Sequence, residues 1–495
     1  MLKYLLMLFL NFYEDKMKNI KIWVMLFLLG GVINAQDFND ALRLSEPGVL
    51  SGARSLGMGN AYSALSNDLS AGTFNPAGFG LIRNLEFDGG LNFNSFSNNT
   101  TFFGKQTSYS SNSTKLSQFG FVFPVPTAQG SLVFALGYSQ SKDFNRSMKF
   151  DGYNPGNTSM IQDLTFSPFR DDNDFTYELG LSYPVTSTMD TTLINGKLNQ
   201  SGKILQEGAI NSWFFSGAVE IEKDIFVGAT IDIFSGTFKR TNDYYEDDFM
   251  GNYPSGLQLD PNDPTTRGFL SFYRNTLLNW DISGWDAKIG LLAKLNDMFN
   301  LGITIRFPKT FTIKETYTVN GQSDFVNTSY TINPPFDYNS EYDITTPFEF
   351  TVGGSYSDRG LTLSADANLI DYTQMEFSSG LDAQTRTDNN NQIKDLFRTV
   401  VNIHAGAEYV IPHSPVIVRA GFMLMPSPFK GDPSEYDKKY ATVGLGIKAD
   451  KKLAFDLAYV YGWWKDIGDN YSYNVSTTYQ DITYHNFAAT MKYFF

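Results

Sequence analysis

From about residue 84 to the C-terminus, the chain carries short segments in which apolar residues occupy every second position. The stretches LAFDLAYVY (453–461) and LTLSADANL (361–369) are two examples, each with one apolar face opposite a mixed or polar one. A period of two is that of a β-strand, whose successive side chains point to opposite faces. The pattern predicts an all-β architecture.

Fourteen segments follow this pattern, and we predict strands at 84–97, 116–124, 130–141, 211–221, 225–238, 284–294, 299–318, 341–357, 360–375, 400–410, 415–426, 439–449, 453–464 and 485–495. Short connections between them, such as EKD, SDR and PHSP, alternate with long polar ones at 142–210, 239–283, 319–340 and 465–484. This alternation along an even number of antiparallel strands is typical of a bacterial outer-membrane barrel with periplasmic turns and extracellular loops.

Closure of the ring is expected because a strand in lipid cannot leave its backbone groups unpaired. The last segment, HNFAATMKYFF, has Phe487, Met491 and Phe495 on one face and ends in an aromatic residue. A soluble β-sandwich or propeller would also alternate, but it does not explain aromatic residues at strand ends such as Trp213 and Trp463. We therefore predict that residues 84–495 form a fourteen-stranded transmembrane barrel in the outer membrane of a Gram-negative bacterium.

Composition agrees with this prediction, since Gly (42), Phe (43) and Tyr (28) are frequent and charged residues make up only 18%. The chain has no Cys, so disulfides cannot stabilise it after export. The formal net charge of -14 argues against nucleic acid as a partner, because phosphates are recognised by Lys and Arg.

The N-terminus predicts export. Residues 17–35 combine two lysines, an apolar run and a small residue at a plausible cleavage point, so 1–35 is interpreted as a signal peptide with a true start at Met17 as one option. A permanent N-terminal membrane anchor is the alternative. The mature chain is expected to begin at Gln36.

The polar face of the strands is expected to line the lumen. It includes Arg306, His404, Glu408 and Arg419, together with lysines and aspartates of other strands. Both signs are interspersed, so ion pairs across the interior are expected rather than a ring of one charge.

A barrel of this size is wider than those whose own side chains fill the lumen, so a plug is needed. Residues 36–83 are the candidate for this hatch. They offer one short helix in DFNDALRLSE, followed by small residues for close packing and by Gly and Pro for turns.

The stretch GARSLGMGNAYSALSNDLSAGTFNPAGFGLI resembles the N-terminal hatch of the FadL/TodX family of outer-membrane transport proteins for hydrophobic compounds. The matching features are two segments between Gly52 and Asp68, followed by the hatch motif Asn75, Pro76, Ala77 and Gly78. The resemblance implies a hatch that blocks the barrel, capture of a hydrophobic molecule by extracellular loops, and passive release sideways into the membrane beside a kinked third strand. In that strand Gly137 is the one hint of a kink.

The 142–210 loop is unusually apolar for a loop. Six of its residues are candidates for a ligand-capture groove: Phe166, Phe169, Phe175, Tyr177, Leu179 and Leu181. Packing of these side chains into a lid over the neighbouring loops is the alternative.

No catalytic site, cofactor or metal site is predicted. The three histidines, His404, His413 and His485, are not in a metal-binding spacing, and the acidic runs RDDND and YYEDDF lack the calcium-loop pattern. We therefore expect a non-enzymatic, monomeric barrel in contact with outer-membrane lipids and lipopolysaccharide. It would take up hydrophobic molecules such as long-chain fatty acids or aromatic hydrocarbons. The alternatives are a non-transporting surface scaffold or export and assembly factor of the same superfamily, and a porin for polar solutes.

Overall fold

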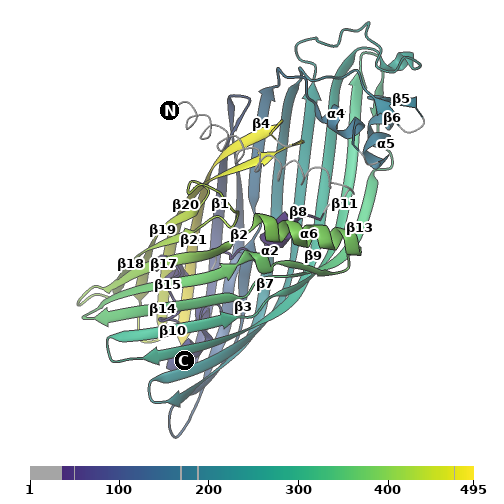
Figure 1. Cartoon of the computed structure of the whole chain (residues 1–495). Coiled ribbons are helices and arrows are strands. Elements are labelled where there is room, and N and C mark those ends of the chain that lie inside the picture. Colours follow the sequence, from purple (N-terminus) through teal and green to yellow (C-terminus); the bar gives the residue numbers. More distant parts are fainter. Residues whose placement is uncertain (1–35, 50, 168–169, 187–188, 473) are drawn as a thin grey trace, which may run out of the picture.

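The computed structural model describes residues 36–49, 51–167, 170–186, 189–472 and 474–495. The predicted signal peptide lies outside the described residues. Those residues form fourteen antiparallel barrel strands, which rise on one side into a tall extracellular wall (Figure 1). The first strand, β1 (Glu86–Phe102), pairs with both its successor and the last strand, β21 (Thr477–Phe494). This pairing closes the ring.

Ten of the barrel strands are continuous: β1, β2 (Lys105–Val125), β7 (Asn199–Glu222), β8 (Ile225–Asp247), β9 (Phe269–Lys294), β17 (Thr399–Val410), β18 (Val416–Met425), β19 (Lys438–Lys448), β20 (Leu453–Asp469) and β21. Four are divided in two: β3 (Leu132–Asp143) with β4 (Arg146–Tyr153), β10 (Phe299–Arg306) with β11 (Thr310–Phe325), β13 (Phe336–Thr345) with β14 (Glu349–Asp358), and β15 (Leu361–Asp371) with β16 (Glu376–Ser379). The fourteen predicted strands are therefore confirmed in order.

The long connections are shorter than predicted, because several strands continue far above the membrane. Strand β8 runs to Asp247 and β9 begins at Phe269, so most of the predicted 239–283 loop is strand. The outward side chains of these extensions, such as Thr241 and Asp243, are polar, which removes the apolar alternation on which the prediction relied. The segment between β3 and β7 holds β4, α4 (Met160–Thr165), α5 (Arg170–Glu178), β5 (Tyr183–Thr186) and β6 (Met189–Thr191).

Shorter elements complete the extracellular side. They are η3 (Pro264–Thr266), β12 (Ser329–Thr331), η4 (Tyr372–Gln374) and α6 (Ala383–Leu396), a helix that the sequence analysis did not predict. Helix α6 lies across the low side of the barrel close to the first helix of the N-terminal segment (Figure 1). None of the helices that the structure describes is both long and apolar enough to cross a membrane.

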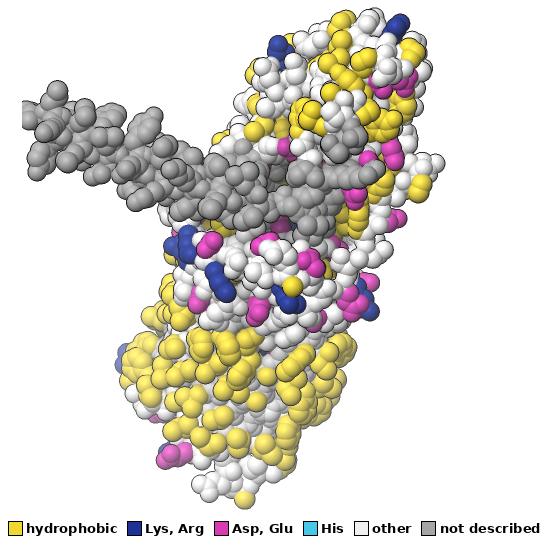
Figure 2. Space-filling view, turned by 45° about the vertical axis from the view of Figure 1, so that its right-hand side comes forward, with side chains coloured by type: hydrophobic (Ala, Val, Ile, Leu, Met, Phe, Trp, Pro, Cys, Tyr) yellow, Lys and Arg dark blue, Asp and Glu magenta, His cyan; other side chains and the backbone are white. Residues whose placement is uncertain are grey.

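The membrane-facing surface is an apolar belt around the periplasmic half of the barrel, with charges of both signs above it (Figure 2). On β8 the outward side chains of Ile231 and Ile233 are 55% and 64% exposed, whereas the outward Lys239 and Thr241 lie higher and are polar. Phe119, Tyr138 and Trp213 contact one another with ring centroids 5.3–5.6 Å apart near the upper end of the belt. Aromatic residues at this level are typical of the membrane interface.

The N-terminal segment fills the lumen as predicted. It consists of α2 (Phe38–Ser45), α3 (Ala53–Gly57), η1 (Leu69–Gly72) and η2 (Pro76–Leu81), and most of residues 51–80 are buried. Glycines on the inner wall let the hatch approach the strands. A Cβ at Gly302 would lie 2.3 Å from the carbonyl oxygen of Ser63, and one at Gly406 would lie 2.3 Å from that of Met58. At these glycines the backbone of the hatch therefore lies directly against the backbone of the barrel wall.

The position of the belt predicts how charge is tolerated along one strand. An Ala229→Arg substitution, at an exposed outward position of β8 between the periplasmic end of the strand and the level of Trp213, should destabilise the folded barrel by roughly 2–4 kcal/mol, the cost of a cation on the lipid face near the bilayer midplane. The matched change Thr241→Arg, on the same face of β8 but above the belt, should cost less than about 1 kcal/mol. Urea unfolding in lipid vesicles measures both, and equal losses would contradict the assigned belt.

Candidate functional site: chambers between the hatch and the wall

The hatch motif holds the plug together. Asn75 begins η2, where its side-chain oxygen accepts a hydrogen bond from the Ala77 amide at 3.1 Å. Its side-chain nitrogen donates to the carbonyl oxygens of Ser63 (2.8 Å) and Leu291 (3.0 Å), so one amide joins two hatch turns to β9. Pro76 supplies the fixed φ that suits the first turn of a helix. In this structure the motif positions backbone rather than lining a chamber.

Side chains from several wall strands fix the hatch. The Asp366 carboxylate of β15 accepts hydrogen bonds from the amides of Tyr62 and Ser63, both at 2.8 Å. Lys492 of β21 pairs with Asp68 at 2.6 Å, and Lys288 of β9 donates to the carbonyl oxygen of Gly72. These bonds reach the plug from separated parts of the ring and oppose its movement as a whole.

The four predicted lumen-wall residues all lie inside the barrel but do not form one site. Arg306 pairs with Asp286 (3.1 Å) and Glu349 (3.7 Å), and the Nδ1 atom of His404 lies 3.0 Å from the carbonyl oxygen of Gly59. Both line the upper side of the hatch.

Glu408 and Arg419 line a separate cavity on the periplasmic side of the hatch. Arg419 bonds Glu408 at 2.6 Å and Asp456 at 2.7 Å, while Arg54 of the hatch reaches Glu408 at 3.1 Å. The expected pairing of opposite charges across the interior is therefore present.

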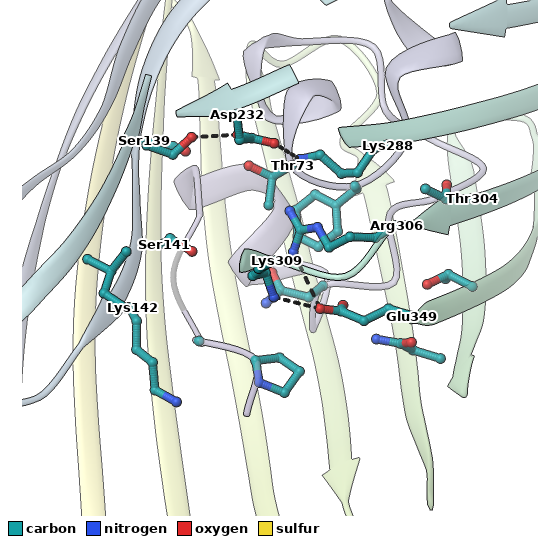
Figure 3. Close-up of a pocket in the computed structure, with 18 of the residues that line it drawn as sticks. Thr73, Ser139, Ser141, Lys142, Asp232, Lys288, Thr304, Arg306, Lys309 and Glu349 are labelled. Carbon is teal, nitrogen blue, oxygen red and sulfur yellow. Dashed lines mark hydrogen bonds and ion pairs between the residues drawn. The ribbon is translucent and has the colours of Figure 1, made fainter. Parts of the chain in front are cut away.

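The chamber directly above the hatch is lined by charged and by apolar side chains (Figure 3). It encloses about 1170 Å³ of empty space, part of it continuous with solvent, and its wall includes Asp232, Lys288, Arg306, Lys309 and Glu349. These charges are neutralised in pairs: Lys288 lies 2.9 Å from Asp232, and Lys309 lies 2.7 Å from Glu349. Apolar side chains, such as Ile210, Phe234 and Phe311, line the same chamber.

A second chamber, on the other side of residues 46–49, combines an apolar wall with cations. Its wall residues are Phe96, Met425, Tyr440, Trp464 and Tyr484, and its charged residues are Glu46, Lys142, Asp143, Arg146 and Lys438. Glu46 pairs with Lys438 at 2.5 Å and with Arg146 at 3.7 Å. Burial would raise the pKa of Glu46, but the charges of Lys438, Lys142 and Arg146 outweigh it and lower the pKa to about 2.

A break in the hydrogen-bonded ladder of the barrel wall, called the gap below, lies beside this second chamber. The ladder between β2 and β3 stops at the pair Gln118 and Ser139, just above the aromatic group of Phe119, Tyr138 and Trp213. Beyond it, β3 and β4 pair with β7 alone among the described strands, and β3 carries an irregularity between Gln140 and Lys142.

Asp143, at the end of β3, spans the gap. Its carboxylate accepts hydrogen bonds from Asn94 of β1 (2.7 Å) and Ser113 of β2 (2.6 Å). The irregularity in the third barrel strand thus lies above Gly137, which was the residue that hinted at a kink.

The predicted capture residues fall into two groups. Phe175, Leu179 and Leu181 are buried in a hydrophobic cluster under the extracellular wall, whereas Phe166 and Tyr177 are 59% and 52% exposed. Phe169 lies outside the described residues. Only the exposed pair can meet a ligand without rearrangement, and the capture role stays a prediction.

Sequence reasoning missed Glu46, Lys142 and Arg146, which line the second chamber. Lys142 and Arg146 follow the predicted third strand in the stretch SKDFNR. Because this stretch is polar, it was interpreted as the start of a loop. Among the described residues, no group of three or more His, Asp or Glu side chains is arranged to hold a metal ion.

Comparison with known proteins places the chain in one family. The family model described as outer membrane protein transport protein (OMPP1/FadL/TodX) matches residues 49–492 of this sequence. The fold resembles that of the Pseudomonas putida toluene transporter TodX (TM-score 0.53, 14% identity, 90% of this chain and 99% of that one). It also resembles a Pseudomonas aeruginosa FadL homologue (0.53, 13%, 91% and 99%) and the CymD monoaromatic hydrocarbon channel (0.50, 12%, 90% and 98%). No protein of curated function matches the sequence.

The hatch contacts predict the effect of removing one of the side chains that hold the hatch, the Asp366 carboxylate. Asp366→Ala leaves the amides of Tyr62 and Ser63 buried without an acceptor, which costs about 1–3 kcal/mol per group. We expect the hatch to loosen and the ion conductance of single barrels in a planar bilayer to rise. Asp358→Ala, in an exposed periplasmic turn, is the matched control and should leave conductance unchanged. Unaltered conductance in the Asp366 variant would show that this carboxylate does not hold the plug.

Glu46 predicts a pH dependence. Because its pKa is lowered from 4.5 to about 2, its ion pairs stabilise the fold fully above pH 4.5, and this stability is lost as pH falls towards 2. Wild type should exceed Glu46→Gln in unfolding free energy by roughly 2 kcal/mol at pH 6, and the difference should shrink below pH 4.5. Urea unfolding at several pH values tests this. If the difference in unfolding free energy between wild type and Glu46→Gln grew as the pH fell, the lowered pKa of Glu46 would be contradicted.

Proposed function

The chain belongs to the OMPP1/FadL/TodX family of outer membrane transport proteins, and we propose that it takes up hydrophobic small molecules and releases them sideways through the gap between β2 and β3. The observation that carries this proposal is the position of the gap. It opens at the upper edge of the apolar belt and adjoins a chamber with an apolar wall.

The substrate class follows from the chamber. Relatives of similar fold are described as a toluene transporter and a monoaromatic hydrocarbon channel, which supports a hydrophobic substrate. The Lys142, Arg146 and Lys438 side chains beside the aromatic wall favour a ligand with an anionic head and an apolar body, such as a long-chain fatty acid. The apolar body would gain about 0.8 kcal/mol for each CH₂ group kept from water.

Sideways release avoids the polar centre of the barrel. A ligand that moved straight down would have to cross the chamber lined by Lys288, Arg306 and Glu349 and then displace a hatch that is bonded to several strands. Through the gap it would leave the aromatic wall of the second chamber, pass Asp143 and reach the apolar belt. In this proposal the hatch closes the axial route and the transport step needs no energy source.

Capture outside the cell would begin at the exposed residues of the extracellular loop. Phe166 and Tyr177 are the described candidates, and Phe169 belongs to the same proposal. Contact of the belt with outer-membrane lipids and lipopolysaccharide, and function as a monomer, are part of it as well.

The rival function is a barrel of the same superfamily that does not transport. The number of bonds that hold the hatch favours it, because a scaffold needs only a sealed lumen. The two functions differ in one respect: a scaffold would not be affected by closing the gap.

A disulfide across the gap tests the proposal. The chain has no Cys, so Ser113→Cys with Asp143→Cys introduces the only pair, at positions whose side chains now meet at 2.6 Å. Uptake of a radiolabelled long-chain fatty acid by cells should fall when the pair is oxidised and recover with reductant. Binding of the same ligand to purified protein should remain.

The control pair is Thr316→Cys with Asn339→Cys, whose side chains meet at 2.9 Å on the outside of the extracellular wall. Its oxidation should leave uptake unchanged. Undiminished uptake through the cross-linked gap would refute sideways release, and absence of binding in a folded barrel would favour the scaffold.

A further inference from the structure

The first described residue, Gln36, is held in a buried position. Its side chain is 6% exposed and donates a hydrogen bond to the Glu315 carboxylate of β11, and its carbonyl oxygen accepts one from Asn389 of α6 at 3.3 Å. Gln36 thus touches both the wall and the helix that crosses the low side of the barrel. Helix α2, which begins at Phe38, also packs against α6.

The surroundings of Gln36 carry an excess of negative charge. Asp37, Asp40 and Glu315 lie around it, and the cations that act on the two aspartates are Arg43 and Arg240. Arg43 forms an ion pair with Asp40. Its guanidinium carbon lies 4.6 Å from the ring centroid of Phe238 and 5.2 Å from that of Trp280.

Among the described residues, only neutral groups donate hydrogen bonds to Glu315. They are the Gln36 amide, the Trp280 indole N–H (2.8 Å) and the Tyr342 hydroxyl (2.8 Å). Within the described part of the chain this carboxylate is therefore without a cation, and a buried charge in that state is costly.

We infer that the missing cation is the α-ammonium group of Gln36, released when the chain is cut between residues 35 and 36. Hydrolysis of that peptide bond by water leaves a carboxylate on the removed peptide and an ammonium on Gln36, and so adds one positive charge beside three carboxylates. The new N-terminus then locks α2 to β11 and α6. Burial raises the pKa of Asp40 to about 7 with help from Asp37, which agrees with a group that lacks positive charge.

The inference has a chemical consequence for the residue itself. An N-terminal glutamine with a free amine can cyclise, because the amine attacks the side-chain amide carbon and ammonia leaves. Here the amide is bonded to Glu315 and the amine is held as an ammonium, which is not nucleophilic. We therefore expect Gln36 to persist as an open, uncyclised residue in the folded protein.

The test uses the full-length protein purified from outer membranes. Mass spectrometry of its N-terminal peptide should give an uncyclised Gln36 as the first residue. Acylation of the α-amine near neutral pH should be at least about tenfold slower in the folded barrel than in denaturant, since pairing that raises an amine pKa by one unit lowers the free amine about tenfold.

The variant Glu315→Gln should restore most of the lost reactivity, whereas Glu341→Gln, an exposed carboxylate on the neighbouring strand, should not. If Glu315→Gln fails to fold, the pKa of the wild-type α-amine can be measured from the pH dependence of acylation. A pKa above the usual 7.7–8.0 supports the pairing with Glu315. A different first residue, a cyclised Gln36, or equal reactivity in folded and unfolded protein would overturn the inference. Fatty-acid uptake is not part of this test, so its outcome is independent of the proposed function.

Discussion

Backbone pairing in hydrocarbon is the constraint on which the rest of this structure depends. Lipid offers no partner for an N–H or C=O group, so the strands must pair all the way round, from β1 to β21. Fourteen strands enclose more space than their own side chains fill, and an open lumen would leak. The hatch, the wall glycines that admit it and the paired charges that hold it are consequences of that closure.

The same constraint determines where the wall can open. Within the apolar belt the ladder between β2 and β3 is intact, from Val125 to Gln118. It stops just above the aromatic group at the membrane interface, where water and head groups can satisfy unpaired backbone. Even there the gap is bridged, since Asp143 bonds side chains of β1 and β2. The proposed exit at this height would reach lipid without exposing unpaired backbone groups to hydrocarbon.

The sequence allowed prediction of those features that repeat and not of those that occur once. Alternation placed all fourteen strands in order, and the small residues near Asn75 placed the hatch. The extracellular extensions were missed because Thr241 and Asp243 face water, where no apolar signal is required. The second chamber was missed because Glu46, Lys142 and Lys438 come from three distant segments. Their meeting depends on the register of the closed ring, which no local pattern encodes.

The distribution of charge explains how one barrel can serve both a membrane and a hydrophobic ligand. Lipid-facing positions such as Ile233 are apolar, while the lumen carries pairs such as Lys288 with Asp232. The paired charges and the hatch both lie on the axial route through the lumen. The aromatic wall that includes Trp464 and Tyr484 lies beside the break in the ladder between β2 and β3. In the proposed route the ligand ends in lipid, which is the most favourable environment for its apolar body.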